Sequence, residues 1–237
     1  MTTFADRVIE FNQHLDFQES LPEGIQVMNP FKDNDQTMPG SSVFYRKYYS
    51  DQDIRFLILG INPGRFGAGV TGIPFTDPKR LIEKCNLEFH GDLKHEPSSV
   101  FVYEVVDAFG GAEAFYRKFY INSVCPLGFT ATGPKGKELN FNYYDKAGKG
   151  PALYHHPSIY NFIVENIQKQ VAMGVSTDLC FCFGKGKNEK FLRRLNDEKG
   201  FFKKIIALEH PRFVMQYRAM SKQVYIEKYL EAFMEAL

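Results

Sequence analysis

The chain has 237 residues, of which 44% are hydrophobic and 24% charged, as is ordinary for a globular protein. Its 29 basic and 28 acidic residues give a net charge of +1, which argues against binding to nucleic acid through bulk charge alone. The sequence contains no run of about 18 apolar residues, so no transmembrane helix is predicted. The N-terminus has no features of a secretory signal. We therefore expect a single domain over residues 1–237, no membrane partner and a cytoplasmic location, associated with the nucleoid if the source is bacterial.

The first half of the chain combines several helical patterns with one strong strand. Apolar positions at helical spacing predict helices over residues 3–16, 98–109 and 112–119. Asp77-Pro78 is typical of a helix cap followed by a first-turn proline, and it begins a predicted helix that runs through Cys85. Residues 54–60 are the first predicted strand, whereas residues 25–50 are rich in turn-forming pairs and are expected to be largely turns.

The second half adds three strands, each followed by a turn or a helix. Strands are predicted over residues 119–124, 178–183 and 205–208, and helices over residues 157–171, 189–195 and 221–237. Residues 128–151 are rich in Gly, Lys and Asn and are expected to form a long surface excursion. This alternation of strands and helices predicts an α/β fold, with a mostly parallel four-stranded sheet and helices on both faces.

The four cysteines give no support to a metal site. Cys85, Cys125, Cys180 and Cys182 form no CxxC pair, and no histidine lies at zinc-ligand spacing from them. In a cytosolic chain they are expected to be buried, reduced thiols. We predict neither a metal nor a cofactor.

The loop after the first strand is the strongest functional signal in the chain. The segment from Gly60 to Phe75 holds five glycines and two prolines, yet it also carries bulky apolar side chains. Glycines let the backbone approach a ligand closely, and long apolar loops are usually functional, so this loop predicts the floor and wall of a pocket. Asn62 stands at the mouth of the strand.

Polar groups also follow two other predicted strands. Asn122-Ser123 ends the second strand, and His210 follows the fourth. If the strands are parallel neighbours, these groups and Asn62 converge on one edge of the sheet, where α/β folds bind ligands. The alternative is that each side chain only caps or satisfies its own loop.

Three segments, in this order, resemble the motifs of the uracil-DNA glycosylase superfamily, most closely its single-strand-selective monofunctional branch. They are Gly60-Ile61-Asn62-Pro63-Gly64 with Thr71-Gly72-Ile73-Pro74-Phe75, then Asn122-Ser123-Val124-Cys125-Pro126-Leu127, and His210-Pro211-Arg212. The resemblance covers residues 54–218 and implies a three-layer α/β/α sandwich that hydrolyses the N-glycosidic bond of a flipped-out uracil in DNA. This would make the protein a monofunctional glycosylase of base-excision repair.

The resemblance also implies roles for individual residues. Asn62 would position the attacking water, and His210 would donate a hydrogen bond to uracil O2 as negative charge develops there. Phe75 would stack on the base, and Ile61 would line the same pocket. Gly64 would leave room beside C5, which predicts tolerance of 5-substituted uracils such as 5-hydroxymethyluracil; the alternative for Gly64 is a turn that requires positive φ.

Two departures from the family pattern concern specificity. Ser123 occupies the place of the uracil-reading asparagine, and Asn122 lies one residue earlier, so either Ser123 reads the base or a bulge brings Asn122 into the pocket. The wedge loop is shortened. It keeps Arg212, and Phe213 and Met215 are candidates either for filling the hole left by a flipped base or for the core.

Lys185 and Lys187, at a glycine-rich turn that opens a helix, are candidate phosphate contacts, with solvated loop charge as the alternative. The expected partner is uracil-containing DNA, single- or double-stranded, and we expect a monomer. Two other functions stay open. One is a catalytically silent nucleic-acid-binding module of the same fold. The other is a small-molecule α/β hydrolase, which is weakened by the lack of a Gly-x-Ser-x-Gly elbow.

Overall fold

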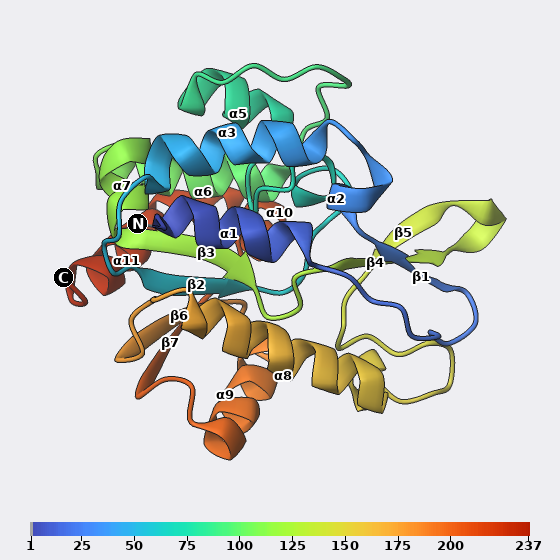
Figure 1. Cartoon of the computed structure of the whole chain (residues 1–237). Helices are drawn as coiled ribbons and strands as arrows, with labels where there is room; N and C mark the ends of the chain where they lie inside the picture. Colours follow the sequence, from blue (N-terminus) through green and yellow to red (C-terminus); the bar gives the residue numbers. More distant parts are fainter. Residues whose placement is uncertain (1) are drawn as a thin grey trace.

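The computed structural model describes residues 2–237 and has a central, fully parallel sheet (Figure 1). Its four strands stand in the order β3-β2-β6-β7. They are β2 (Phe56–Gly60), β3 (Phe119–Ser123), β6 (Leu179–Phe183) and β7 (Lys204–Leu208). The predicted α/β class and the four-stranded sheet are confirmed, and every pairing in the sheet is parallel.

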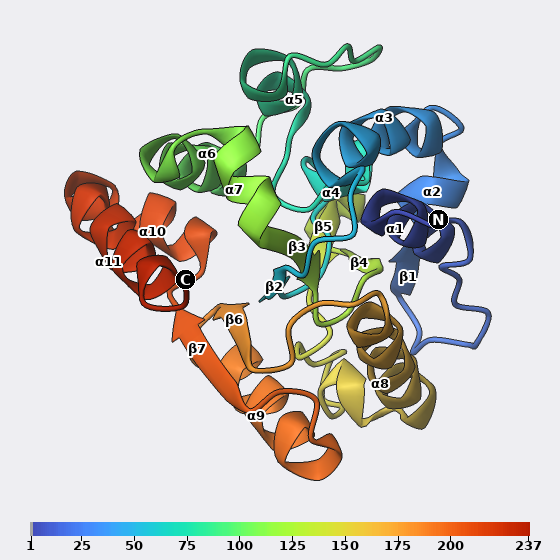
Figure 2. The ribbon, with the colours of Figure 1, turned by 60° about the vertical axis from the view of Figure 1, so that its left-hand side comes forward.

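Helices cover both faces of this sheet, as parallel strands require (Figure 2). The longer helices are α1 (Phe4–Gln13), α3 (Thr37–Tyr49), α5 (Pro78–Cys85), α6 (Pro97–Phe109), α8 (Pro157–Ala172), α9 (Lys187–Lys199) and α11 (Lys222–Met234). The shorter ones are α2 (Pro30–Asp33), α4 (Ala68–Thr71), α7 (Ala112–Lys118) and α10 (Pro211–Tyr217), with 3-10 turns η1 (Pro134–Gly136), η2 (Leu153–His155) and η3 (Ala219–Ser221).

Neighbouring residues of β3 show how the two helical layers attach. The ring of Phe119 packs on Phe233 of α11, with ring centroids 4.6 Å apart. The ring of Tyr120 packs on Phe4 of α1, at 5.2 Å. Successive strand residues point to opposite faces of a sheet, so α11 and α1 lie on opposite sides of it. This arrangement is the predicted three-layer α/β/α sandwich.

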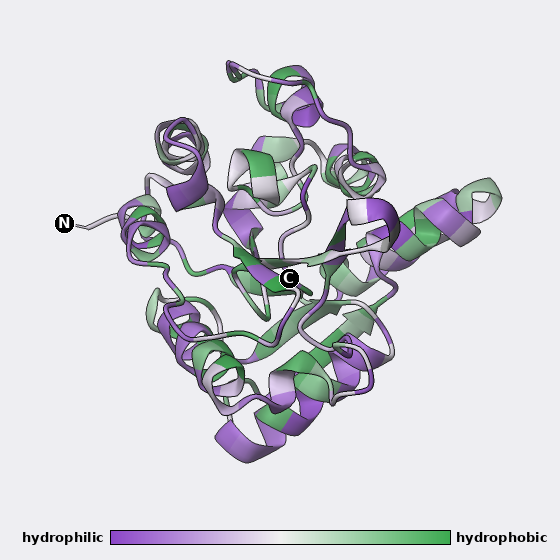
Figure 3. Cartoon of the chain, turned by 90° about the vertical axis from the view of Figure 1, so that its right-hand side faces the viewer, coloured by the Kyte–Doolittle hydropathy of each residue, from purple (hydrophilic) through white to green (hydrophobic). Residues whose placement is uncertain are grey.

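The core is rich in aromatic side chains and runs through both layers. Figure 3 shows mainly hydrophobic strands at the centre and many hydrophilic residues on the surrounding helices. All five residues of β6 are buried, which explains its unbroken apolar sequence. All four cysteines are free and buried. Burial raises the pKa of each of these thiols.

The expectation of turns over residues 25–50 was wrong. This segment contains β1 (Ile25–Met28), α2 and α3. In α3, Phe44, Tyr45, Tyr48 and Tyr49 are buried at helical spacing. Pro39 and Gly40 suggested a break, but Pro39 lies in the first turn, where a missing N–H breaks no helical hydrogen bond.

The expectation of a surface excursion over residues 128–151 was also wrong in part. Strands β4 (Gly128–Thr132) and β5 (Glu138–Phe141) join β1 in a second, antiparallel sheet of order β1-β4-β5. The ring of Tyr143 in this segment is fully buried. Within residues 2–237, no helix is long and apolar enough to cross a membrane.

Candidate active site

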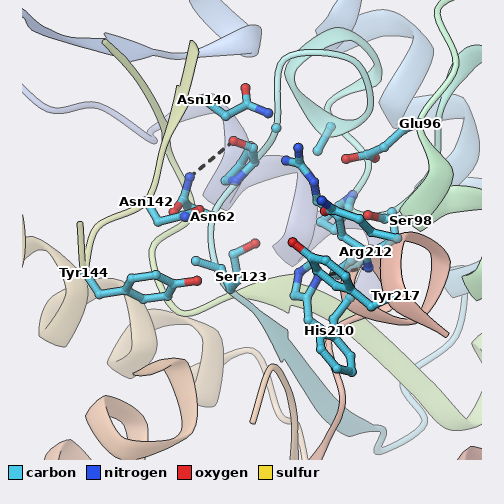
Figure 4. A pocket seen from close by; sticks show the side chains of 18 residues that line it. Asn62, Glu96, Ser98, Ser123, Asn140, Asn142, Tyr144, His210, Arg212 and Tyr217 are labelled. Atoms are coloured by element: carbon cyan, nitrogen blue, oxygen red, sulfur yellow. Dashed lines mark hydrogen bonds between the residues drawn. The ribbon is translucent and has the colours of Figure 1, made fainter. Parts of the chain in front are cut away.

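A cavity of about 350 Å³ opens at the carboxyl ends of the central strands. It is lined by residues at the ends of three of the four strands, because these strands are parallel and end at one edge. Figure 4 shows two facing walls with Ser123 between them. One wall carries Asn62, Asn140, Asn142 and Tyr144, and the other carries Glu96, Ser98, His210, Arg212 and Tyr217.

Asn62 is held by backbone groups at the end of β5 and just after it. Its Oδ1 accepts a hydrogen bond from the Tyr143 N–H at 3.2 Å, and its Nδ2 donates to the Phe141 carbonyl oxygen at 3.3 Å. These two bonds fix which way the amide faces, since an amide oxygen only accepts and its nitrogen only donates. The second sheet, absent from the sequence expectations, therefore orients the first candidate catalytic residue.

A buried hydrogen-bond chain anchors that segment in turn. The Tyr143 hydroxyl donates to Asn188 Oδ1 at 2.6 Å. The Nδ2 of Asn188, in the first turn of α9, donates to the Phe183 carbonyl at 3.2 Å and to the Gly60 carbonyl at 3.4 Å. These hydrogen bonds thus connect the ends of β2 and β6 to the backbone that holds Asn62.

His210 caps the N-terminus of α10 and lines the cavity. Its Nδ1 accepts a hydrogen bond from the Arg212 N–H at 3.1 Å, so the neutral ring carries its proton on Nε2. Burial, with a smaller contribution from the Arg212 charge, lowers the pKa of His210 from 6.5 to about 4. At neutral pH the site therefore contains an uncharged imidazole with one N–H donor for a ligand.

Phe75 lies in the cavity wall in a left-handed backbone conformation, with φ of 54°. A bulky non-glycine residue in this region costs about 1 to 3 kcal/mol, and such residues cluster at functional sites. The ring packs 5.6 Å from Phe183 and 5.6 Å from His210, centroid to centroid. A Cβ on Gly60 would lie only 2.8 Å from this ring, so glycine at position 60 makes space for Phe75.

Ser123 and Asn122 point to opposite faces of β3. The strand is paired regularly, with Gly60 opposite Ser123, so no bulge turns Asn122 toward the cavity. Asn122 is buried away from it, where its Nδ2 donates to the Tyr120 hydroxyl at 2.8 Å. Ser123 lines the cavity. The candidate role of Asn122 in reading the base is therefore withdrawn, and Ser123 is the candidate that remains.

Gly64 is not in the left-handed region, so the alternative of a turn requiring positive φ was wrong. Space is the constraint here. A Cβ on Gly64 would lie 3.2 Å from Glu96 Oε1, and a Cβ on Gly67 would lie 1.9 Å from Glu96 Oε2. The Glu96 carboxyl therefore lies directly against the glycine-rich loop.

Glu96 is a half-buried acid at the start of α6. Its backbone N–H donates to Asp77 Oδ2 at 2.8 Å, which holds the residue in place. Burial and then the charge of Asp77 raise the pKa of Glu96 from 4.5 to about 7, while Arg212 acts in the opposite direction. This shift makes Glu96 the acid of the cavity most easily protonated near neutral pH.

The segment after His210 was expected to form a wedge loop, but this was wrong, because residues 211–217 form helix α10. Arg212 and Phe213 line the cavity, and the Phe213 side chain is 38% exposed. Met215 packs against the core instead. Tyr217, which the sequence did not suggest, lies on the rim, with its ring centroid 5.4 Å from that of Phe213.

The comparisons with known proteins identify the family of the chain. The family model of the Uracil DNA glycosylase superfamily matches residues 46–234, which include both cavity walls. The chain belongs to the uracil-DNA glycosylase superfamily. It is therefore an enzyme that hydrolyses N-glycosyl bonds in DNA, and the resemblance noted in the sequence is confirmed.

A solved structure is also similar to this glycosylase over its whole length. The crystal structure of wild-type SMUG2 from Pedobacter heparinus superposes with a TM-score of 0.94 at 59% sequence identity. The match covers 100% of this chain and 99% of that chain. Among curated proteins, no match is found.

The two lysines predicted to contact DNA lie outside the cavity of the glycosylase, close to its rim. Lys185 Nζ lies 3.1 Å from Glu209 Oε1, beside His210. Lys187 Nζ lies 5.4 Å from the ring centroid of Tyr144, which lines the cavity. Both side chains are more than half exposed, so a DNA backbone that crosses this rim is able to reach them.

Several cavity residues were missed by the sequence reasoning. They are Glu96, Ser98, Asn140, Asn142, Tyr144, Gln216 and Tyr217. Asn140 and Asn142 alternate with aromatic residues, and this period of two was a readable sign of one polar face. Glu96 and Ser98 carry no local signal, because only the fold brings the start of α6 to the glycine-rich loop.

Proposed function

We propose that this glycosylase removes uracil from DNA through Asn62 and His210, and that it also accepts 5-hydroxymethyluracil. The observation that carries the proposal is the pairing of an oriented amide with a neutral imidazole donor across one cavity. Phe75 provides the aromatic face for the base, and Ser123 provides a hydroxyl at the floor.

His210 acts on the leaving group. As the N-glycosidic bond breaks, negative charge develops on the pyrimidine, and an Nε2–H donor stabilises it at O2. An uncharged donor is suitable, because it needs no proton transfer and does not change charge near neutral pH. Preorganised donors of this kind typically contribute about 3 to 4 kcal/mol to transition-state stabilisation.

Asn62 acts on the water. An amide is not a strong base, so its role is to hold the nucleophile on the side of the sugar from which it attacks. The backbone bonds to Tyr143 and Phe141 restrict the amide before substrate binds. The reaction then depends on leaving-group stabilisation more than on proton abstraction.

We further propose that the chain acts as a monomer with one domain. A continuous hydrophobic core from Phe4 to Phe233 supports the single domain. For the wedge we propose Phe213, since its ring is wholly apolar, partly exposed and adjacent to the cavity, whereas the more exposed Tyr217 carries a hydroxyl. Arg212, Lys185 and Lys187 are proposed to contact the DNA backbone.

One assay tests the proposal against a silent DNA-binding module. The protein is incubated with uracil in single- and double-stranded oligonucleotides, and abasic sites are then cleaved with alkali. Asn62→Ala and His210→Ala are each expected to lower the excision rate by about 10²- to 10⁴-fold. His90→Ala, at a side chain that is 82% exposed, serves as the control. Absence of strand scission on both substrates would refute the proposed activity.

A further inference from the structure

Glu96 is the one strongly perturbed acid in the cavity that the proposed reaction does not use. Its carboxyl makes no hydrogen bond or ion pair to another side chain in the described chain, residues 2–237. Neither oxygen is among the fully buried atoms without a partner, so water reaches the carboxyl in the free protein. A polar group of the substrate can replace that water.

The surroundings of Glu96 define what that partner meets. Gly64 and Gly67 let the carboxyl pack directly against the loop, as Cβ atoms at these positions would fall 3.2 and 1.9 Å from it. Asp77, already paired with Arg80 and 3.7 Å from His95, lies behind it, and Arg212 faces it from α10. The carboxyl is therefore fixed at one end of the cavity, with charged neighbours of both signs.

The position of a bound base follows from the role of His210, so this inference rests on the proposed function. O2 and a 5-substituent stand at opposite ends of the pyrimidine ring. A base whose O2 meets the His210 donor therefore directs its 5-substituent away from His210. Figure 4 shows Glu96 and His210 well apart along the same wall. The space beside Gly64, which the sequence suggested was empty, holds this carboxyl.

We propose that Glu96 is a specificity-determining residue that selects uracils by the polarity of their 5-substituent. The hydroxyl of 5-hydroxymethyluracil donates to the ionised carboxylate and can accept from the protonated carboxyl, so a hydrogen bond forms in either protonation state. The methyl group of thymine offers no hydrogen bond and displaces the water that can reach the carboxyl beside unsubstituted uracil, so thymine is disfavoured by the desolvation of Glu96. A carboxylate at C5 is repelled when Glu96 is ionised.

The test compares excision rates within one protein sample, so that each ratio is independent of the folded fraction. Oligonucleotides carry uracil, 5-hydroxymethyluracil, thymine or 5-carboxyuracil. Glu96→Met removes the hydrogen-bonding group at similar length and is expected to lower the 5-hydroxymethyluracil-to-uracil ratio about tenfold. It is also expected to raise the thymine-to-uracil ratio about fivefold. Glu88→Met, at a side chain that is 92% exposed, is the matched control.

A second variant gives a gain of function. Glu96→Gln keeps a donor and an acceptor but removes the charge, so it is expected to raise the 5-carboxyuracil-to-uracil ratio about tenfold at pH values about one unit above the Glu96 pKa. Unchanged ratios in both variants, with uracil excision intact, would overturn the inference. So would a parent enzyme that excises uracil but not 5-hydroxymethyluracil. If the parent enzyme does not excise uracil at all, the result refutes the proposed function on which this inference rests.

Discussion

The Tyr143 hydroxyl donates a 2.6 Å hydrogen bond to Asn188, and the backbone N–H of the same tyrosine donates to Asn62. One residue thus joins the buried end of the central sheet to the amide that we propose holds the water. Because Tyr143 is fully buried, this connection is shielded from solvent. The orientation of Asn62 depends on a contact made from a segment outside the central sheet.

We expect Tyr143→Phe to lower kcat for uracil excision about 5- to 30-fold with little change in KM, since one buried hydrogen bond contributes about 1 to 2 kcal/mol. Asn188→Ala should act in the same way, and the double variant should lose less than the sum. Single-turnover kinetics measure these effects. Tyr160→Phe, whose hydroxyl bonds Glu198 on the surface, is the control. Additive losses would contradict a shared role.

The pH dependence of excision should reflect the lowered pKa of His210. An ordinary histidine would be half protonated at pH 6.5, whereas burial moves the pKa of His210 to about 4. The imidazole is therefore neutral over the working range, and its contribution to stability, present above pH 6.5, is lost as the pH falls through about 4. Rates on uracil-containing DNA should stay nearly constant down to a pH of about 5.5. A midpoint near 6.5 in folded protein would contradict this.

The contribution of Glu96 to stability should change with pH in the direction opposite to that of His210. Its pKa is raised from 4.5 to about 7, so the folded state disfavours the charged form. The stability that this group contributes is complete below pH 4.5 and is lost as the pH rises through about 7. Glu96→Gln should thus be more stable than the parent by about 1 to 3 kcal/mol at alkaline pH and equal to it in acid. Urea unfolding at several pH values measures the difference, with Glu88→Gln as control.

Phe213 should matter more in duplex than in single-stranded DNA. A wedge fills the hole left by a flipped base, and only a duplex has such a hole. Phe213→Ala is expected to lower excision from double-stranded DNA about tenfold more than from single-stranded DNA. Met220→Ala removes a fully exposed side chain nearby and should leave the ratio unchanged. Equal losses on both substrates would assign Phe213 to the pocket wall instead.

The central sheet was predictable because its strands are buried on both faces. Leu179–Phe183 is apolar throughout, and such runs are read directly from sequence. The second sheet was not predictable in the same way. Glu138–Phe141 alternates polar and apolar residues, but it is only four residues long and largely exposed, and its pairing with Gly128–Thr132 is what defines it as a strand.

The same distinction applies to the site. Asn62 and Ser123 lie at the ends of two predicted strands, so their convergence was expected on the condition that these strands are parallel neighbours, which they are. Glu96 lies at the start of α6, which a hydrogen bond to Asp77 holds next to the glycine-rich loop. The residues around Glu96 in the sequence do not indicate a pocket. Residues positioned by long-range packing are visible only once the fold is known.

The four thiols inside the core have a practical consequence. Cys85, Cys125, Cys180 and Cys182 are buried, and their raised pKa values keep them in the unreactive thiol form. A thiol reagent in solution therefore reacts only when the surrounding layers separate. The rate at which the reagent modifies the thiols therefore measures how often the core opens. Cys180 and Cys182 lie on β6, which pairs with β2, the strand that leads into the glycine-rich loop. Modification of these two thiols therefore reports the opening of the sheet beside the cavity.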